Sequence, residues 1–190
     1  MTGVMVCRAK TRNSYAMNSA PAATPEQVMG TCLRLELEAS ALYRRFQAVA
    51  PDAELSDLWE TMAQAELHHA HMIDQLASRR GFTVPAISRE ALAAIVERID
   101  AIRREADAPD LGSDRMLSIT AALEFSEMDD LFGAICQAGG VDPDAGRADH
   151  LAPLMNVVLA RESGSGVLRH LLAAMIRLRR RAETANALRP

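Results

Sequence analysis

Glu66 and His69 are the residues whose types and spacing most clearly suggest chemistry. They stand three positions apart in a long helical stretch, so their side chains share one face of the helix. Apolar residues recur on that same face, at Leu58, Met62, Ile73 and Leu76. A carboxylate and an imidazole directed at a core both need a partner. That partner is either a divalent transition metal such as zinc, iron or manganese, or simply the other side chain, in a buried Glu–His hydrogen bond.

Three other stretches with helical periodicity also place glutamates among their apolar residues. In the first stretch Glu36 lies in the apolar stripe, whereas Glu38 points to another face. In the third, Glu124 and Glu127 stand one turn apart, where two ionised carboxylates repel each other unless they share a cation. Glu162 lies in the apolar seam of the fourth. The pattern therefore predicts several carboxylates directed at one core.

Most of these glutamates also have an ordinary structural explanation. Glu36 could lie at the rim of the core and pair with Arg34 or Arg44. The buried face of the third helix could instead be formed by Leu123, Phe125 and Met128, with the glutamates beside it. His68 and His71 fall on other faces of their helix than His69, and we interpret both as solvent-exposed residues rather than metal ligands.

Composition limits the class of protein. The 190 residues suffice for one domain with a substantial core, and the low aromatic content of 4%, with few β-branched runs, favours an all-α protein. The net charge of −4 argues against general nucleic-acid binding, and no apolar run approaches the roughly 18 residues that span a membrane. Cys7, Cys32 and Cys136 form no C-x-x-C pair, which excludes a thiolate metal knuckle and favours a reducing compartment, the cytosol.

Capping residues and glycines predict where the helices begin and end. Thr24 and Gln27 form a capping box around Pro25, which marks the first helix start. The first predicted helix runs from Thr24 to near Val49, and the second from near Ser56 or Asp57 to Gly81. A shorter amphipathic helix begins at Ser88. The third main helix runs from about Ser113 to Ala138, before Gly139-Gly140, and the fourth begins near Asp149 or Pro153. We expect loops at 106–113 and 141–150.

The two ends of the chain differ from the middle. Residues 1–22 contain arginine and serine but no acidic residue, and we expect them to be disordered or loosely attached, leaving 23–190 as the helical domain. In the fourth main helix, Ser163-Gly164-Ser165-Gly166 is a run of weak helix formers that could kink the helix. The basic residues 177–181 suit a helix C-terminus and need no partner.

Four long amphipathic helices with carboxylates on their seams predict a four-helix bundle with those carboxylates meeting inside it. Di-iron bundles use one glutamate from each of two helices and Glu-x-x-His from each of the other two. Such a group of buried carboxylates is untenable without cations. The joint pattern is therefore much more specific for metal binding than any one of its members.

The sequence resembles the rubrerythrin branch of the ferritin-like family over roughly residues 25–185. The resemblance is carried by Glu36 to Tyr43 in the first helix, Ala63 to Ala70 in the second, Ala121 to Met128 in the third with the extra glutamate that marks rubrerythrins, and Ala160-Arg161-Glu162 in the fourth. It implies an all-α, ferritin-like four-helix bundle with an additional helix in the crossover between helices two and three.

The resemblance also implies a site and an activity. Two irons would be held by the metal ligands Glu36, Glu66, His69, Glu124, Glu127 and Glu162. Glu66 and Glu162 would bridge the irons, and one iron would move between His69 and Glu127 as the redox state changes. Ferrous iron would reduce peroxide or dioxygen, with zinc or manganese as other metals of the site. The chain contains no rubredoxin-like module, so the electrons would come from an external donor.

One position departs from the family pattern. Where the fourth helix should carry the histidine of Glu-x-x-His, this chain has Ser165, and His170 lies about 12 Å further along a regular helix from Glu162. One metal would therefore lack its imidazole. This leaves two alternatives to an enzyme, an iron-handling protein without catalytic turnover and a metal-free helical scaffold. Bundles of this kind often pair, so a homodimer is compatible with the resemblance.

Overall fold

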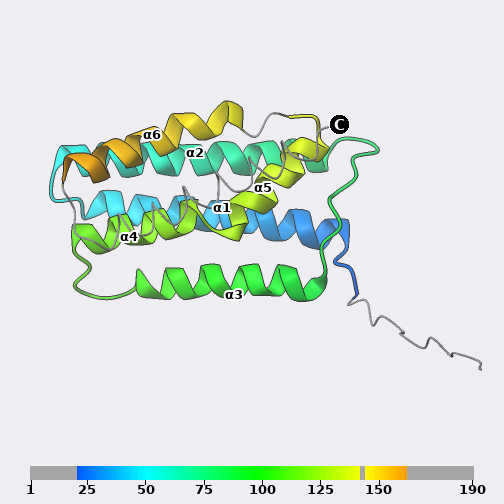
Figure 1. Ribbon diagram of the computed structural model, residues 1–190, viewed down its shortest axis with the longest axis horizontal. Coiled ribbons are helices and arrows are strands. Elements are labelled where there is room, and N and C mark those ends of the chain that lie inside the picture. The colour runs from blue at the N-terminus through cyan, green and yellow to red at the C-terminus, as the bar shows by residue number, and fades with distance from the viewer. Residues whose placement is uncertain (1–20, 142–143, 162–190) are drawn as a thin grey trace, which may run out of the picture.

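The computed structural model describes residues 21–141 and 144–161, and most of these residues lie in helices joined by loops (Figure 1). The helices are α1 (Pro25–Ala48), α2 (Ala53–Ala77), α3 (Arg89–Glu105), α4 (Ser113–Glu124), α5 (Glu127–Ala138) and α6 (Asp144–Ala160). The one β-type pairing in the described part of the chain is an isolated bridge between Ala22 and Ser88. The predicted all-α class is confirmed.

α1 and α2 form an antiparallel pair that makes the most extensive helix–helix contact (Figure 1). α6 lies along α2, α4 lies along α1, and α3 lies in the crossover between α2 and α4, against α1 and α4. None of the helices in the described ranges is long and apolar enough to cross a membrane. The expected disordered segment, 1–22, falls outside the described residues except for Pro21 and Ala22, which pair with the chain around Ser88.

The predicted start of α1 is confirmed. The Thr24 side chain accepts a hydrogen bond from the Gln27 backbone, and the Gln27 side chain accepts one from the Thr24 backbone. The helix ends at Ala48, with Val49 as its C-cap, as predicted. Ser88 caps α3 in the same way, by accepting a hydrogen bond from Ala91.

Both predicted limits of α2 are wrong by a few residues. α2 begins at Ala53 rather than at Ser56 or Asp57, because the Asp52 side chain accepts a hydrogen bond of 3.0 Å from the Leu55 backbone. It ends at Ala77, four residues before Gly81. Gly81 does have the left-handed backbone expected of it, with φ 80°, but it belongs to the turn after the helix.

The predicted helix from Ser113 to Ala138 is two helices. α4 ends at Glu124 and α5 begins at Glu127, with Phe125 and Ser126 between them. Ser126 Oγ accepts a hydrogen bond from the Met128 backbone and so acts as the N-cap of α5. The periodicity predicted that Glu124 and Glu127 lie one turn apart on a single helix. They instead lie on two different helices.

α6 begins earlier than predicted. The stretch 141–150 was expected to be a loop because it is rich in Asp, Pro and Gly, but α6 starts at Asp144 and continues through Pro153. The glycine stop before it is confirmed, because α5 ends at Ala138 and Gly140 has φ 67°. The predicted interruption at Ser163–Gly166 and the basic end at 177–181 lie outside the described residues.

The buried apolar residues among the helices form two clusters. One cluster is centred on Tyr43, Trp59 and Leu117, and the other contains Ile73, Phe132 and the two cysteines Cys32 and Cys136. On α1, residue 36 lies between members of the two clusters, one turn after Cys32.

Candidate metal centre

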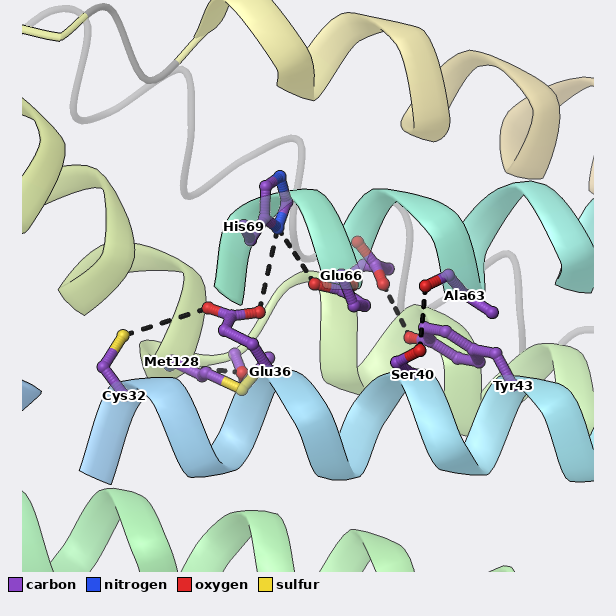
Figure 2. A network of polar contacts seen from close by, with 10 residues as sticks. Cys32, Glu36, Ser40, Tyr43, Ala63, Glu66, His69 and Met128 are labelled. Carbon is purple, nitrogen blue, oxygen red and sulfur yellow. Dashed lines mark hydrogen bonds and ion pairs between the residues drawn. The ribbon is translucent and has the colours of Figure 1, made fainter. Parts of the chain in front are cut away.

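Glu36, Glu66 and His69 converge in the interior of the protein (Figure 2). Their exposed fractions are only 1%, 2% and 4%. His69 Nδ1 lies 2.9 Å from Glu66 Oε2 and 3.7 Å from Glu36 Oε2, and one donor atom from each residue lies within 4.8 Å of the other two. Three of the predicted ligands are thus brought together from two helices.

The helix pair α1–α2 positions these three side chains. Glu66 and His69 share the inner face of α2 as their spacing predicts, and Glu36 faces them from α1. One turn further along α1, Ser40 Oγ donates a hydrogen bond of 2.9 Å to the carbonyl oxygen of Ala63. This contact joins a small side chain directly to the α2 backbone, which holds the two helices close together beside the site.

Phe132 on α5 packs against the imidazole of His69. The ring centroids lie 4.3 Å apart, with 33° between the ring planes. Phe132 is itself fully buried in the apolar cluster that contains Ile73. This contact fixes the plane of the His69 ring and places an apolar wall over it.

The buried position of the site disfavours the ionisation of two neighbouring carboxyl groups. Burial raises the pKa of Glu66 well above its ordinary value, and the charges of Glu124 and Glu36 raise it further. The hydrogen bond with His69 acts in the opposite direction. A cation bound among these carboxylates would remove the repulsion, since it favours the ionised form of each of them.

Glu124 lies beside this group and is held by Tyr43. The Tyr43 hydroxyl donates a hydrogen bond of 2.6 Å to Glu124 Oε1, and both side chains are buried. Burial, followed by the charge of Glu124, raises the pKa of Tyr43, so the phenol keeps its proton and remains a donor. Sequence reasoning placed Tyr43 in the apolar stripe of α1 and did not predict this contact. The sequence did indicate that Tyr43 lies near the buried carboxylates, since it follows Glu36 by seven residues and so lies on the same helix face.

The remaining predicted ligands are not placed at the site. Glu127 is the first residue of α5, but its side chain is not described, and Glu162 lies outside the described residues together with Ser165 and His170. The roles of Glu127 and Glu162 as metal ligands therefore stay predictions.

The ordinary structural roles considered for Glu36 and Glu124 do not agree with their positions. Glu36 is not a rim residue, since it is buried and Arg34 pairs with Glu38 instead. Glu124 is buried together with its neighbour Leu123, so it does not lie outside the buried face. On α2, the predicted exposure of the other histidines is confirmed for both of them, His68 and His71.

The donor atoms fit a transition metal in type and spacing. Imidazole with carboxylates suits zinc, iron and manganese. Bonds of about 2.1 Å allow two ligand atoms on one ion to lie at most about 4.2 Å apart. The separations of 2.9 and 3.7 Å from His69 to the two glutamates are both within this limit. The three side chains could therefore bind one ion with small adjustments.

Comparison of the chain with protein-family models, with curated proteins and with solved structures gives no match. The resemblance to rubrerythrins therefore remains a prediction from the motifs in the sequence. Among the described residues, Glu36, Glu66 and His69 form the one group of three or more side chains of suitable type and spacing that could hold a metal ion.

Proposed function

We propose that this chain is a cytoplasmic, ferritin-like four-helix bundle of the rubrerythrin type that binds iron in its core and reduces peroxide or dioxygen. α1, α2, α4 with α5, and α6 would be the four bundle elements, and α3 the additional helix of the crossover. Electrons would come from an external donor. The free thiols of Cys32 and Cys136 are consistent with a reducing compartment.

The observation that carries the proposal is the buried group of Glu36, Glu66 and His69. Two carboxylates that are taken out of water next to each other cost several kcal/mol unless they are neutralised or paired. Metal binding accounts for both the burial and the choice of ligand types. The nearby Glu124 adds a further carboxylate whose charge acts on Glu66.

The side chains have distinct roles in this proposal. Glu36 and Glu66 would balance the charge of the ion, and His69 would provide the nitrogen ligand. Phe132 shields the imidazole, and Tyr43 holds Glu124 by its hydroxyl. When bound, ferrous iron would supply electrons and polarise the O–O bond as a Lewis acid.

One observation favours a metal-free scaffold as the second candidate. His69 Nδ1 and Glu66 Oε2 lie 2.9 Å apart, which is a normal hydrogen-bond distance. This contact could satisfy part of the buried polar group without an ion. It would leave the adjacent Glu36 carboxylate close to a second carboxylate, which is why we favour metal binding.

Elemental analysis of the purified full-length protein and two variants tests the proposal. Glu66→Ala should lose most of the bound metal, whereas His68→Ala, an exposed histidine two positions away, should keep it. Equal metal content in the two variants would place the site elsewhere. The absence of metal from protein reconstituted with ferrous iron would favour the scaffold.

Peroxide-dependent oxidation of the iron-loaded protein separates an enzyme from a protein that only binds iron. Stopped-flow absorbance should show oxidation that is faster than for ferrous iron in buffer and that recurs when a reductant is supplied. Stoichiometric binding without recurring oxidation would support the iron-handling alternative.

A further inference from the structure

Leu37 on α1 and Leu67 on α2 are large apolar side chains that stay exposed on the outside of the helix pair, with accessible fractions of 46% and 36%. Each directly follows a buried carboxylate in the sequence, Glu36 or Glu66, and lies on the outer side of its helix. A single exposed leucine is ordinary on a protein surface, whereas apolar side chains that adjoin one another mark a contact with another molecule. The positions of the two leucines relative to each other therefore matter.

The two leucines lie at the same height on the two helices, beside the line along which the helices meet. Ser40 Oγ donates its hydrogen bond to the Ala63 carbonyl oxygen across this line. Leu37 stands three residues before Ser40 and Leu67 four residues after Ala63, so each leucine lies on the same side of its helix as that contact. Because α1 and α2 are antiparallel (Figure 1), both steps lead in the same direction, by about 4.5 and about 6 Å. The leucines therefore form one apolar area.

Charged residues flank this apolar area at a distance of two helical turns. Arg44 lies seven residues after Leu37 on α1, and Glu60 and Asp74 lie seven residues before and after Leu67 on α2. A separation of seven residues keeps side chains on one face of a helix, and all three charged residues are exposed. We call these five residues the α1–α2 outer face. It has an apolar centre and charged ends, which is the usual anatomy of a protein–protein interface.

The two helices carry opposite charges at one end of the outer face. Arg44 stands four residues after Ser40 and Glu60 three residues before Ala63, so the two lie at the same height. At this end α1 is basic and α2 is acidic. At the other end α2 is acidic again, through Asp74.

This distribution of charge selects one way of pairing two copies of the chain. With a two-fold axis parallel to the helices, α1 of each copy lies on α2 of the other, so Leu37 meets the second copy's Leu67 and Arg44 meets the second copy's Glu60. With a two-fold axis across the helices, α2 lies on α2, and Glu60 meets the second copy's Asp74. Like charges brought together in this way oppose association, so the parallel axis is favoured.

The outer face has the area that a dimer needs. Helices of 24 and 25 residues are each about 36 Å long and about 10 Å wide, which gives about 700 Å² per copy. Interfaces of standard size bury about 800 Å² per partner. Because leucines rather than aromatic residues form the centre, we expect a dissociation constant in the micromolar range. Single copies then prevail in the dilute solutions used for unfolding measurements.

We propose that the α1–α2 outer face binds a second copy of this chain, with α1 of each copy lying on α2 of the other. The apolar contact of Leu37 with Leu67 forms its centre, and the pairing of Arg44 with Glu60 sets its orientation. The proposal depends on exposed residues of α1 and α2 and is independent of metal binding.

Sedimentation velocity of the full-length protein, from micromolar to several hundred micromolar, tests this interface. The wild type should pass from monomer to dimer over this range. Leu37→Glu places a charge at the apolar centre and should weaken the dimer at least about tenfold. Leu159→Glu, at an exposed leucine of α6 with an accessible fraction of 60%, is the matched control and should leave the dimer unchanged.

Two charge reversals test the orientation. Arg44→Glu and Glu60→Arg should each be monomeric alone, because each brings two like-charged pairs together in the dimer. An equimolar mixture of the two should form a dimer, since both pairs are then of opposite charge. A wild type that stays monomeric, or a dimer that Leu37→Glu leaves intact, would overturn the proposal. A mixture no more dimeric than its components would overturn the orientation on which the proposal depends.

Discussion

The Tyr43 hydroxyl on α1 donates a hydrogen bond of 2.6 Å to Glu124 Oε1 at the last position of α4. The two residues are 81 positions apart in the chain, and both are buried. The contact therefore ties two helices together and fixes one oxygen of a candidate metal ligand. It also places a proton donor where the helical run of α4 ends.

Removing this hydroxyl should destabilise the protein. Tyr43→Phe keeps the aromatic ring but deprives a buried carboxylate of a donor, which should lower the free energy of unfolding by about 1–3 kcal/mol. Urea unfolding of the metal-free protein measures the change. Thr61→Val, which removes an exposed hydroxyl from α2, is the control and should alter stability by no more than about 0.5 kcal/mol. A Tyr43→Phe variant as stable as the control would show that the bond contributes nothing.

Helical periodicity predicted the α1–α2 part of the site because each residue there is placed by its own helix. Glu36, Glu66 and His69 are each placed by the face of a single regular helix, and helix faces can be read from spacing. The partner of Tyr43 could not be predicted in this way, because it depends on packing between distant segments.

The break at Ser126 was missed for a different reason. Its hydroxyl competes locally with the helical hydrogen bonds, and the apolar periodicity continues across it without interruption. The start of α6 was missed because Asp, Pro and Gly in 141–150 are typical of loops, whereas tertiary context overrides such propensities.

The pH dependence of stability should reveal the buried Glu66 carboxyl in the metal-free protein. Burial, with the charges of Glu124 and Glu36, raises the pKa of Glu66 above its value in the unfolded chain. For a raised pKa, the stabilising contribution is complete below the unfolded-state value of about 4.3 and is lost as the pH rises through the folded-state value. The wild type should therefore lose stability relative to Glu66→Gln, which stays neutral, as the pH increases towards neutrality.

Urea unfolding of both proteins across this pH range measures the difference. Glu60→Gln, an exposed glutamate on the same helix, is the matched control, and its stability should follow that of the wild type at each pH. If the difference in stability between the wild type and Glu66→Gln stayed constant with pH, the pKa of Glu66 would not be raised in the folded protein.

Metal addition should stabilise the fold through the same residues. A ligand that binds only the folded state at a concentration 100 times its Kd adds about 2.7 kcal/mol, which corresponds to an increase in Tm of about 5–10 °C for a chain of this size. Thermal unfolding with and without ferrous iron or zinc measures the shift, and a chelator should reverse it. Glu66→Ala should abolish the shift, and His68→Ala should preserve it. A Tm that does not respond to metal would argue against a site in the core.

Gly30, in the second turn of α1, should accept a larger residue with a gain in stability. A Cβ atom added there meets nothing within 4 Å. Alanine is more favourable than glycine in a helix interior by about 1 kcal/mol, so Gly30→Ala should raise Tm by about 2–4 °C. Thermal unfolding measures this change, and a lower Tm would mean that this face of α1 is covered.

Gly139, the C-cap of α5, should show the opposite response because α2 lies against it. A Cβ atom there would come within 2.4 Å of Leu76 Cδ2 and 3.2 Å of Cδ1, and the Leu76 side chain is only 1% exposed. The backbone of Gly139 has φ −83°, which alanine adopts without strain, so the cost comes from displacing Leu76 in a packed core. Gly139→Ala should therefore lower stability by about 1–3 kcal/mol. The Gly139→Ala, Leu76→Ala double variant should lose less stability than the two single changes add up to, because the smaller side chain removes the clash. A Gly139→Ala variant as stable as Gly30→Ala would contradict this prediction. It would mean that α2 and α5 are packed less closely than the contact between Phe132 and His69 requires.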